Sequence, residues 1–295
     1  MNISLDCVPC FVRQALEAAR MATDDPVAHE QMLRDVLRLT ADMDLLNTPP
    51  VIGQRIHRRL RELTGNLDPY AVVKETFNRM AMEMLSDLRK RVLAAENPFA
   101  AAVRLAIAGN IIDFGPKAHT TEDDAIEAIS NALSDPLHGD IDAFQTACEQ
   151  ADNILYLADN AGEIVFDRLL IEQLPASCVT LAVRGYPVIN DATIADAHMA
   201  GLTDVAEVVE NGSDAPGTVL SDCSAAFQQR FAAADIIISK GQGNYETLSD
   251  VSASIYFLFK AKCPVIAAHA CVSVGAQVLT SNMSAFHEPG TWRKE

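Results

Sequence analysis

From about residue 150 onward, short apolar runs alternate with stretches that have helical hydrophobic spacing. Strands that are apolar on both faces and separated by helices are typical of a parallel sheet covered on both sides. The pattern therefore predicts an α/β fold, a Rossmann-like α/β/α three-layer domain with a mainly parallel sheet. The predicted strands are 153–158, 178–183, 205–209, 235–239 and 264–268, and the predicted helices lie near 162–174, 192–200, 218–233 and 245–260.

The first 98 residues differ, because apolar side chains recur there at helical spacing and no convincing strand is present. We expect an all-helical N-terminal domain over 1–98 and the sheet domain over 99–295. The segment 100–109 fits either a strand or a buried helix, and the preceding Asn97 and Pro98 favour the helix, since proline is tolerated in a first helical turn. The predicted N-terminal helices cover 8–21, 32–39, 50–63 and 70–93.

The two halves also differ in charge. The chain of 295 residues carries a formal charge of −17, of which residues 1–99 contribute −1 and residues 100–295 contribute −16. Such a field repels phosphate backbones and anionic lipids, so we expect neither nucleic acid nor a membrane as a partner. No apolar run reaches the roughly 20 residues that span a bilayer, and no secretory pattern is visible. Seven scattered cysteines are typical of reduced thiols in a cytoplasmic protein.

Polar side chains and glycines follow several of the predicted strands, where an open parallel sheet binds its ligands. Asp159, Asn160 and Asp191 are oxygen ligands suited to a divalent ion such as Mg²⁺ or Mn²⁺. The alternative is that Asp159 caps the following helix, with Glu163 in its first turn, and that Asp191 belongs to another helix start. Spacing alone leaves both interpretations open.

A KGQGN segment follows the fourth predicted strand. Gly241 and Gly243 would let backbone N–H groups approach a phosphate, with Lys240 supplying charge, whereas the alternative is a plain tight turn. The spacing matches neither the dinucleotide-binding fingerprint nor the P-loop. Further upstream, Asn110 and Asp113 either line the site from the side or belong to an ordinary helix end, which is the favoured interpretation.

Cys7 and Cys10 form a Cys-x-x-Cys pair near the N-terminus. A structural zinc ion needs four ligands, and Cys263, His269 and Cys271 are conceivable partners. Because no second Cys-x-x-Cys pair exists in the chain, buried core thiols are the favoured interpretation.

In this combination the motifs resemble a known family. They are CVPC at 7–10, GNIID at 109–113, DNAGEIVFD at 159–167, RGYP at 184–187 with NDAT at 190–193, and KGQGNYE at 240–246. The sequence resembles the damage-control metal-dependent phosphatase family, long catalogued as a domain of unknown function, and within it the compact prokaryotic branch with an N-terminal Cys-x-x-Cys. The resemblance covers nearly the whole chain, and DNAGE together with KGQGN is its specific part.

The resemblance implies an α/β/α domain with an N-terminal helical domain, and a divalent metal ion (Mg, Mn, Co or Ni) held by Asp159, Asn160 and Asp191, which would also be the catalytic residues. It implies the removal of phosphate from small phosphorylated metabolites, including sugar phosphates and damaged phosphopantetheine-like compounds. By motif match, Asn110, Asp113, Lys240 and Asn244 would line the substrate phosphate, and the neighbouring Glu163, Arg184, Gly241 and Gly243 are further candidates for phosphate binding.

The leading hypothesis is therefore a metal-dependent phosphomonoester hydrolase, because a divalent ion would supply the positive charge that a domain at −16 lacks. Two alternatives are an S-adenosylmethionine-dependent carboxyl methyltransferase and a non-catalytic module that binds a metal or a metabolite. A Rossmann-like sheet permits all three, because the fold does not determine the function.

Overall fold

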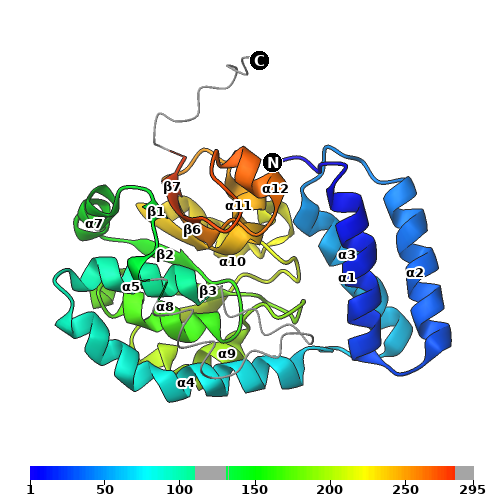
Figure 1. Ribbon diagram of the computed structural model, residues 1–295, viewed down its shortest axis with the longest axis horizontal. Coiled ribbons are helices and arrows are strands. Elements are labelled where there is room, and N and C mark those ends of the chain that lie inside the picture. The colour runs from blue at the N-terminus through cyan, green and yellow to red at the C-terminus, as the bar shows by residue number, and fades with distance from the viewer. Residues whose placement is uncertain (110–130, 132, 283–295) are drawn as a thin grey trace, which may run out of the picture.

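The computed structural model describes residues 1–109, 131 and 133–282 (Figure 1). Its first three helices stand together at one side of the sheet and enclose a hydrophobic cluster of their own, which includes Phe11, Met32 and Ile56. These helices are predicted from the sequence and are confirmed. They are α1 (Cys7–Ala22), α2 (Pro26–Ala41) and α3 (Pro49–Thr64).

The next two helices, α4 (Ala71–Ala94) and α5 (Pro98–Ala108), connect this group to the sheet. Ala81, Leu85 and Leu88 of α4 are buried in the same cluster as side chains of the sheet. Helix α5 confirms the helical interpretation of the segment 100–109. The division of the chain into domains at residue 98 stays a prediction.

A sheet of seven strands occupies the centre of the molecule in the order β1-β7-β6-β5-β2-β3-β4. All neighbouring strands are parallel except β6 and β7, which are antiparallel. The chain proceeds from β2 to β3 and β4 on one side, and then places β5 on the other side of β2. The strands are β1 (Leu137–His138), β2 (Ile154–Leu157), β3 (Val179–Val183), β4 (Glu207–Glu210), β5 (Ile236–Lys240), β6 (Ile255–Lys260) and β7 (Gln277–Ser281).

Helices cover both faces of this sheet and complete three layers (Figure 1). One face packs against α4 and α5 together with α7 (Ile141–Gln150), α8 (Glu163–Ile171) and α9 (Ile194–Met199). The other packs against α10 (Ala225–Ala233), α11 (Gly241–Leu248) and α12 (Pro264–His269). The predicted α/β three-layer fold with a mainly parallel sheet is thus confirmed.

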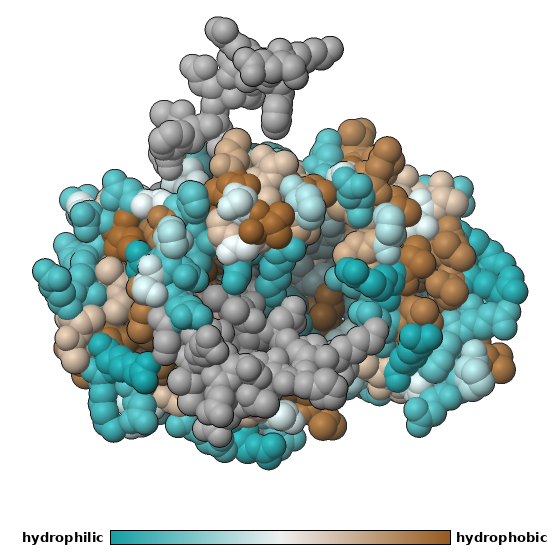
Figure 2. All heavy atoms as spheres, in the orientation of Figure 1, coloured by the Kyte–Doolittle hydropathy of each residue, from teal (hydrophilic) through white to brown (hydrophobic). Residues whose placement is uncertain are grey.

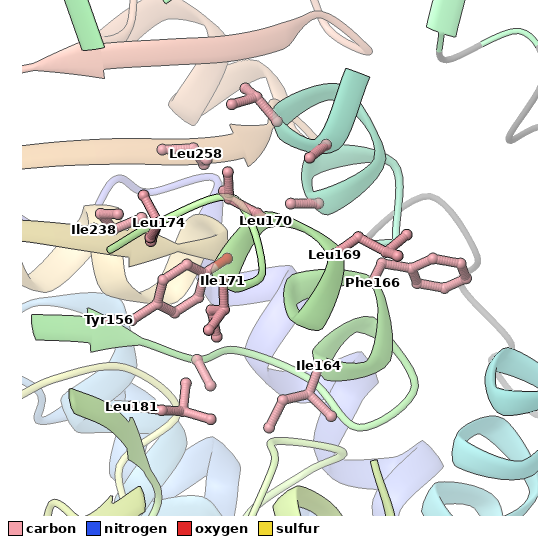
Figure 3. Packing of buried hydrophobic residues seen from close by; sticks show 14 of the residues in the cluster. Tyr156, Ile164, Phe166, Leu169, Leu170, Ile171, Leu174, Leu181, Ile238 and Leu258 are labelled. Carbon is pink, nitrogen blue, oxygen red and sulfur yellow. The ribbon is translucent and has the colours of Figure 1, made fainter. Parts of the chain in front are cut away.

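Helix α8 is enclosed more completely than the outer helices. Figure 3 shows its residues Ile164, Leu170 and Ile171 among side chains of the sheet, with Tyr156 of β2 pointing toward the helix. All of them are at most 1% exposed. A helix that is buried on most sides can carry polar residues only where they are paired, and the polar residues of α8 lie in the site described below.

Local sequence explains where several helices begin. The side chains of Asp25, Asn97, Asp140 and Ser224 precede α2, α5, α7 and α10, and each accepts a hydrogen bond from a backbone N–H in the first turn of its helix. At the other end of α3, Gly65 ends the helix in the left-handed conformation (φ +69°).

Three predictions for the second half of the chain are wrong in detail, and strand β7 is not among the predicted strands. The predicted strand 264–268 is helix α12, in which Pro264 occupies the first turn. The predicted helix 245–260 ends at Leu248, and its remaining apolar run forms strand β6. The helix predicted from residue 218 begins only at Ala225. Strand β7 joins the sheet antiparallel to β6.

The surface on the face shown in Figure 2 is largely hydrophilic, with smaller hydrophobic areas between. Exposed large hydrophobic side chains such as Leu5, Val27 and Val72 lie on different helices or loops, as is usual for globular proteins. Across the part of the chain that the structure describes, no helix combines the length and the apolar character needed to cross a membrane.

Candidate functional site

The candidate site lies at the carboxyl ends of β2 and β5, where the strand order reverses and open α/β sheets bind their ligands. Asp159 closely follows β2, and Lys240 is the last residue of β5. The next residue, Gly241, has φ +77°, and a Cβ at that position would overlap the Asp159 carboxylate. Only glycine therefore fits between the two strand ends.

The segments after β2 and β3 lie side by side. The backbone N–H of Ala192 donates to the carbonyl oxygen of Asp159 at 2.8 Å, and Asn160 pairs with Asp191 across the two segments. The carboxylate-bearing residues Asp159 and Asp191 are only 8% and 4% exposed. The structure thus brings Asp159, Asn160 and Asp191 together, and their roles as metal ligands stay a prediction.

The alternative, in which these acids cap helices, does not fit the structure. The N-cap residue of α8 is Gly162, and no side chain caps this helix. The N-cap residue of α9 is Thr193, which forms a capping box with Asp196. Asp159 and Asp191 are therefore left for another role.

The side-chain amide of Asn160 has a fixed orientation. Its Nδ2 donates to Oδ2 of Asp159 at 2.7 Å and to Oε2 of Glu163 at 3.0 Å. Because both amide hydrogens face carboxylates, the amide oxygen Oδ1 is directed elsewhere. An amide held in this way presents an oxygen donor beside Asp159, as a hard divalent cation requires.

Arg184 follows β3 and is 2% exposed. Its Nε donates to Oδ2 of Asp191 at 2.6 Å, and Nη2 lies 3.8 Å from Oδ1 of Asp159. The same guanidinium group reaches Oδ1 of Asn244 at 3.3 Å and Oγ1 of Thr218 at 3.5 Å. Arg184 thus holds the two acids in place and links them to the start of α11.

Lys240 is buried under the site with no exposed surface. Its Nζ donates to Oε1 of Glu163 and Oδ1 of Asp167, both at 2.6 Å, and to the carbonyl oxygen of Ala106 at 2.7 Å. Tyr156 donates to the same Asp167 oxygen at 2.8 Å. These contacts raise the pKa of the Lys240 ammonium group, although burial opposes the rise. All three ammonium hydrogens therefore have protein acceptors.

Negative charge is in excess in this buried group. The carboxylates are Asp159, Glu163, Asp167 and Asp191. Among the described residues, these acids form ion pairs with two cations, Arg184 and Lys240, so carboxylates outnumber the cations that pair with them. Lys262 and Lys74 add weaker positive charge that acts on Asp159 and Asp191, respectively. Burial, together with the charges of Glu163 and Asp191, raises the pKa of Asp159 well above its ordinary value.

The pKa of Asp191 is also raised, by burial, with Arg184 opposing the rise. Burial is likewise the main cause that raises the pKa of Asp167 to about 6.

These charges fit a divalent cation. An ion of charge +2 would offset part of the excess of carboxylates, and two carboxylates with an amide oxygen are the donors that such an ion prefers. Among the described residues, no group of three or more His, Cys, Asp or Glu side chains is arranged to hold a metal ion. The predicted set contains only two such residues, since its third donor is the amide of Asn160.

The other predicted phosphate-binding residues have various surroundings. Asn244 donates to the carbonyl oxygens of Ala158 and Lys240 at 3.1 and 2.8 Å, so its amide ties the ends of β2 and β5 together. Gly243 packs against the backbone of Pro216, where a Cβ would overlap the carbonyl oxygen. Asn110 and Asp113 lie outside the described residues.

Sequence reasoning did not assign a role to several residues of the site. Asp167 lies one helical turn beyond Glu163 on α8, and two acids at this spacing in a run of apolar residues are a signal of buried ion pairing. Asn78 of α4 accepts a hydrogen bond from the N–H of Gly162 at 2.7 Å and donates to Asp196. No local pattern marks Asn78, because its partners are more than 80 residues away in the sequence.

The Cys-x-x-Cys pair belongs to helix α1 and not to the strand ends that carry the acids. All cysteines are free thiols in the described part of the chain, and Cys7 and Cys10 at the start of α1 are partly buried. Burial raises the pKa of both thiols, and the nearby Cys263 contributes to the rise. Cys263 is thus close to the pair, as the sequence allows, although no metal-holding group is formed among the described residues.

Fold and site together define a class: a three-layer α/β protein with a buried group of acids, amides and paired cations at the point where the strand order reverses. Comparisons with known proteins make this class specific. The family model described as the damage-control phosphatase ARMT1-like domain matches residues 3–278.

Relatives of similar length cover almost the whole chain. A damage-control phosphatase of Pyrococcus horikoshii is 36% identical, over 96% of this chain and 99% of its own. One of Archaeoglobus fulgidus is 34% identical, over 94% and 98%. The crystal structure of a DUF89 family protein from Pyrococcus horikoshii superposes with a TM-score of 0.88 at 35% identity, covering 96% of this chain and 99% of that one.

The chain therefore belongs to the damage-control phosphatase family, as the resemblance of its motifs indicates. The names of the two relatives support a phosphatase.

Proposed function

We propose that this protein is a divalent-metal-dependent phosphatase that hydrolyses small phosphorylated metabolites, with sugar phosphates and phosphopantetheine-like compounds as the first candidates. The observation that carries the proposal is the excess of buried carboxylates at the switch point of the sheet, beside the oriented amide of Asn160. An acidic site of this kind can accept a phosphate ester only when a cation is present.

Asp159, Asn160 and Asp191 would hold the ion. When bound, a divalent ion supplies positive charge at the phosphoryl oxygens. Arg184 keeps Asp191 oriented by a buried hydrogen bond and adds a second positive charge next to Asp159. Mg²⁺, Mn²⁺, Co²⁺ and Ni²⁺ are all compatible with a set of oxygen donors.

The other predicted residues have more limited roles in this proposal. Gly241 lets the end of β5 approach Asp159, and Asn244 fixes that approach by bonding to backbone carbonyl oxygens at the ends of both strands. Asn110 and Asp113 are kept as candidates for contact with the substrate phosphate.

The direct test is phosphate release from a panel of phosphorylated metabolites with each of the four metal ions. We expect activity that requires a divalent ion and is lost on chelation. Asp159→Ala is expected to reduce turnover by at least about 1,000-fold, because it removes both a ligand and its charge.

The matched control is Asp152→Ala. Asp152 is an exposed carboxylate just before β2, at the opposite end of the same strand. We expect it to leave activity unchanged, and equal activity of wild type and Asp159→Ala would refute the assignment of the site.

A further inference from the structure

We infer that Lys240 is a positioning residue and does not bind the substrate phosphate. In this inference, the Lys240 ammonium group holds Glu163, and Glu163 in turn fixes the side-chain amide of Asn160 at the metal site. The inference rests on the proposed function for the place of the metal ion, and it assigns a task to two residues without a predicted role, Asp167 and Tyr156.

The first step concerns the donors of Lys240. An ammonium group has three N–H donors, and those of Lys240 are directed to Glu163, Asp167 and the Ala106 carbonyl oxygen at 2.6–2.7 Å. The residue has no exposed surface. A phosphate could gain Lys240 as a partner only by breaking one of these short, charge-assisted hydrogen bonds in a buried environment, which is costly.

The second step concerns the two oxygens of Glu163, which have different partners. Oε1 accepts from Lys240 at 2.6 Å, and Oε2 accepts from Nδ2 of Asn160 at 3.0 Å. Because Glu163 is 2% exposed, solvent competes little for either bond. The Glu163 carboxylate is therefore bonded to both Lys240 and Asn160, so the position of the lysine determines the position of the amide.

The orientation of the Asn160 amide determines which of its atoms can face a metal ion. Rotating the Asn160 amide by half a turn would place its oxygen against the carboxylates of Asp159 and Glu163, an arrangement in which acceptors face acceptors. Glu163 therefore determines that Oδ1 of Asn160 is the atom available to a cation. Groups that orient metal ligands in this way typically change metal affinity by about 10- to 100-fold when they are removed.

Asp167 and Tyr156 form the other end of this hydrogen-bonded network, beyond Lys240. Asp167 accepts from Lys240 and from the hydroxyl group of Tyr156, which reaches α8 from β2 (Figure 3). Glu163 and Asp167 are four residues apart on α8, so they hold the ammonium group between them. A buried lysine held by two carboxylates of one helix cannot move toward the site without leaving one of them unpaired.

The test measures Mn²⁺ binding by calorimetry without phosphate or substrate, and then binding of inorganic phosphate at saturating Mn²⁺. Lys240→Met keeps the length of the side chain and removes its charge. We expect Mn²⁺ binding about tenfold weaker or worse, and phosphate affinity within about threefold of wild type once Mn²⁺ is bound. Unchanged Mn²⁺ binding together with a large loss of phosphate affinity would overturn the inference.

Lys240→Met leaves two carboxylates buried without their cation, so a second variant guards against misfolding. Lys240→Met combined with Asp167→Asn removes one charge of each sign. We expect this double variant to be more stable than Lys240→Met and still to bind Mn²⁺ about tenfold more weakly than wild type. Recovery of wild-type Mn²⁺ affinity in the double variant would overturn the inference, because charge balance alone would then explain the loss.

A matched control distinguishes the loss of positioning by Lys240 from a general loss of core packing. Phe227 of α10 is 1% exposed and packs on the opposite face of the sheet. Phe227→Leu is expected to lower stability and to leave Mn²⁺ affinity within about twofold of wild type. A loss of Mn²⁺ affinity in Phe227→Leu as large as in Lys240→Met would overturn the inference.

These measurements are independent of turnover. If the wild type binds Mn²⁺ but releases phosphate from no metabolite, the proposed function fails and the positioning role of Lys240 can still be measured. If the wild type is an active phosphatase and Lys240→Met binds Mn²⁺ normally, the proposed function stands and the positioning inference fails.

Discussion

Arg184 donates a hydrogen bond of 2.6 Å from Nε to Oδ2 of Asp191, and the two side chains are only 2% and 5% exposed. Arg230 and Glu207 form an ion pair of the same length at the surface, where they are 42% and 54% exposed. The protein thus contains two arginine–carboxylate pairs with the same shortest distance, one buried and one exposed, and the loss of stability on removing each arginine can be measured.

Arg184→Met is expected to lower the free energy of unfolding of the metal-free protein by about 3–5 kcal/mol, because Asp191 keeps its buried charge without a partner. Added Mn²⁺ should restore part of this loss. Arg230→Met serves as the control, with an expected loss below about 1 kcal/mol. Urea denaturation of both variants checks the prediction, and equal losses would contradict it.

A second prediction concerns the repulsion between the buried carboxylates of the site. Asp159→Asn removes one negative charge from a buried group in which negative charge is in excess, so we expect the metal-free variant to melt several degrees above the wild type. Mn²⁺ should raise the melting temperature of the wild type and have little effect on the variant. Thermal melts with and without Mn²⁺ test both parts.

Asp152→Asn, at the exposed opposite end of β2, is the control for this prediction. It should keep the wild-type melting temperature and the full response to Mn²⁺. A wild type that gains no thermal stability from any divalent ion would contradict the metal site.

The position of the site could be predicted from the sequence because parallel strands end at the same edge of a sheet. Asp159, Asn160 and Asp191 follow two buried apolar runs, so their proximity follows once the runs are identified as neighbouring strands. The same reasoning failed for the segment 264–268. Its five residues fit a strand or a helix equally well by length and hydrophobicity, and Pro264 started a helix instead.

The sequence of strand β6 contains a signal that favours a strand. Its residues 255–260 are rich in aromatic and β-branched side chains, which favour a strand over the end of a long helix. The partners of Lys240 are a different case, because the sequence does not reveal toward which side of the strand end a lysine turns. That direction depends on Glu163 and Asp167, which α8 brings under β5 only in the folded chain.

A third prediction tests the close approach of the two strand ends. Gly241→Ala introduces both backbone strain at φ +77° and overlap with the Asp159 carboxylate. Gly65→Ala introduces similar strain at φ +69°, but within the described part of the chain the new Cβ meets no atom within 4 Å apart from its own local backbone. We expect Gly65→Ala to cost about 1 kcal/mol of stability and Gly241→Ala to cost clearly more and to weaken Mn²⁺ binding. Calorimetry of Mn²⁺ binding and urea denaturation of both variants test this prediction. Equal losses of stability and equal Mn²⁺ affinities in the two variants would refute the packing argument.

A fourth prediction concerns acid stability and lies outside the site. Burial, with the positive charge of Arg61, lowers the pKa of His57 from 6.5 to about 4. Above pH 6.5 the imidazole is neutral in both the folded and the unfolded chain, so its full contribution to stability is present. Between pH 6.5 and 4 only the unfolded chain takes up the proton, which lowers the free energy of unfolding by about 3 kcal/mol across that window.

His57→Phe should therefore show a smaller loss of stability than the wild type between pH 6.5 and 4, as measured by urea denaturation at intervals of half a pH unit. The comparison with the wild type is needed because buried carboxylates such as Asp167 also titrate in this range. His138→Gln, which changes an exposed imidazole in β1, should follow the wild-type profile. If the free energy of unfolding falls by the same amount in His57→Phe and the wild type between pH 6.5 and 4, His57 is protonated in the folded state. Its burial then does not control the loss of stability in acid.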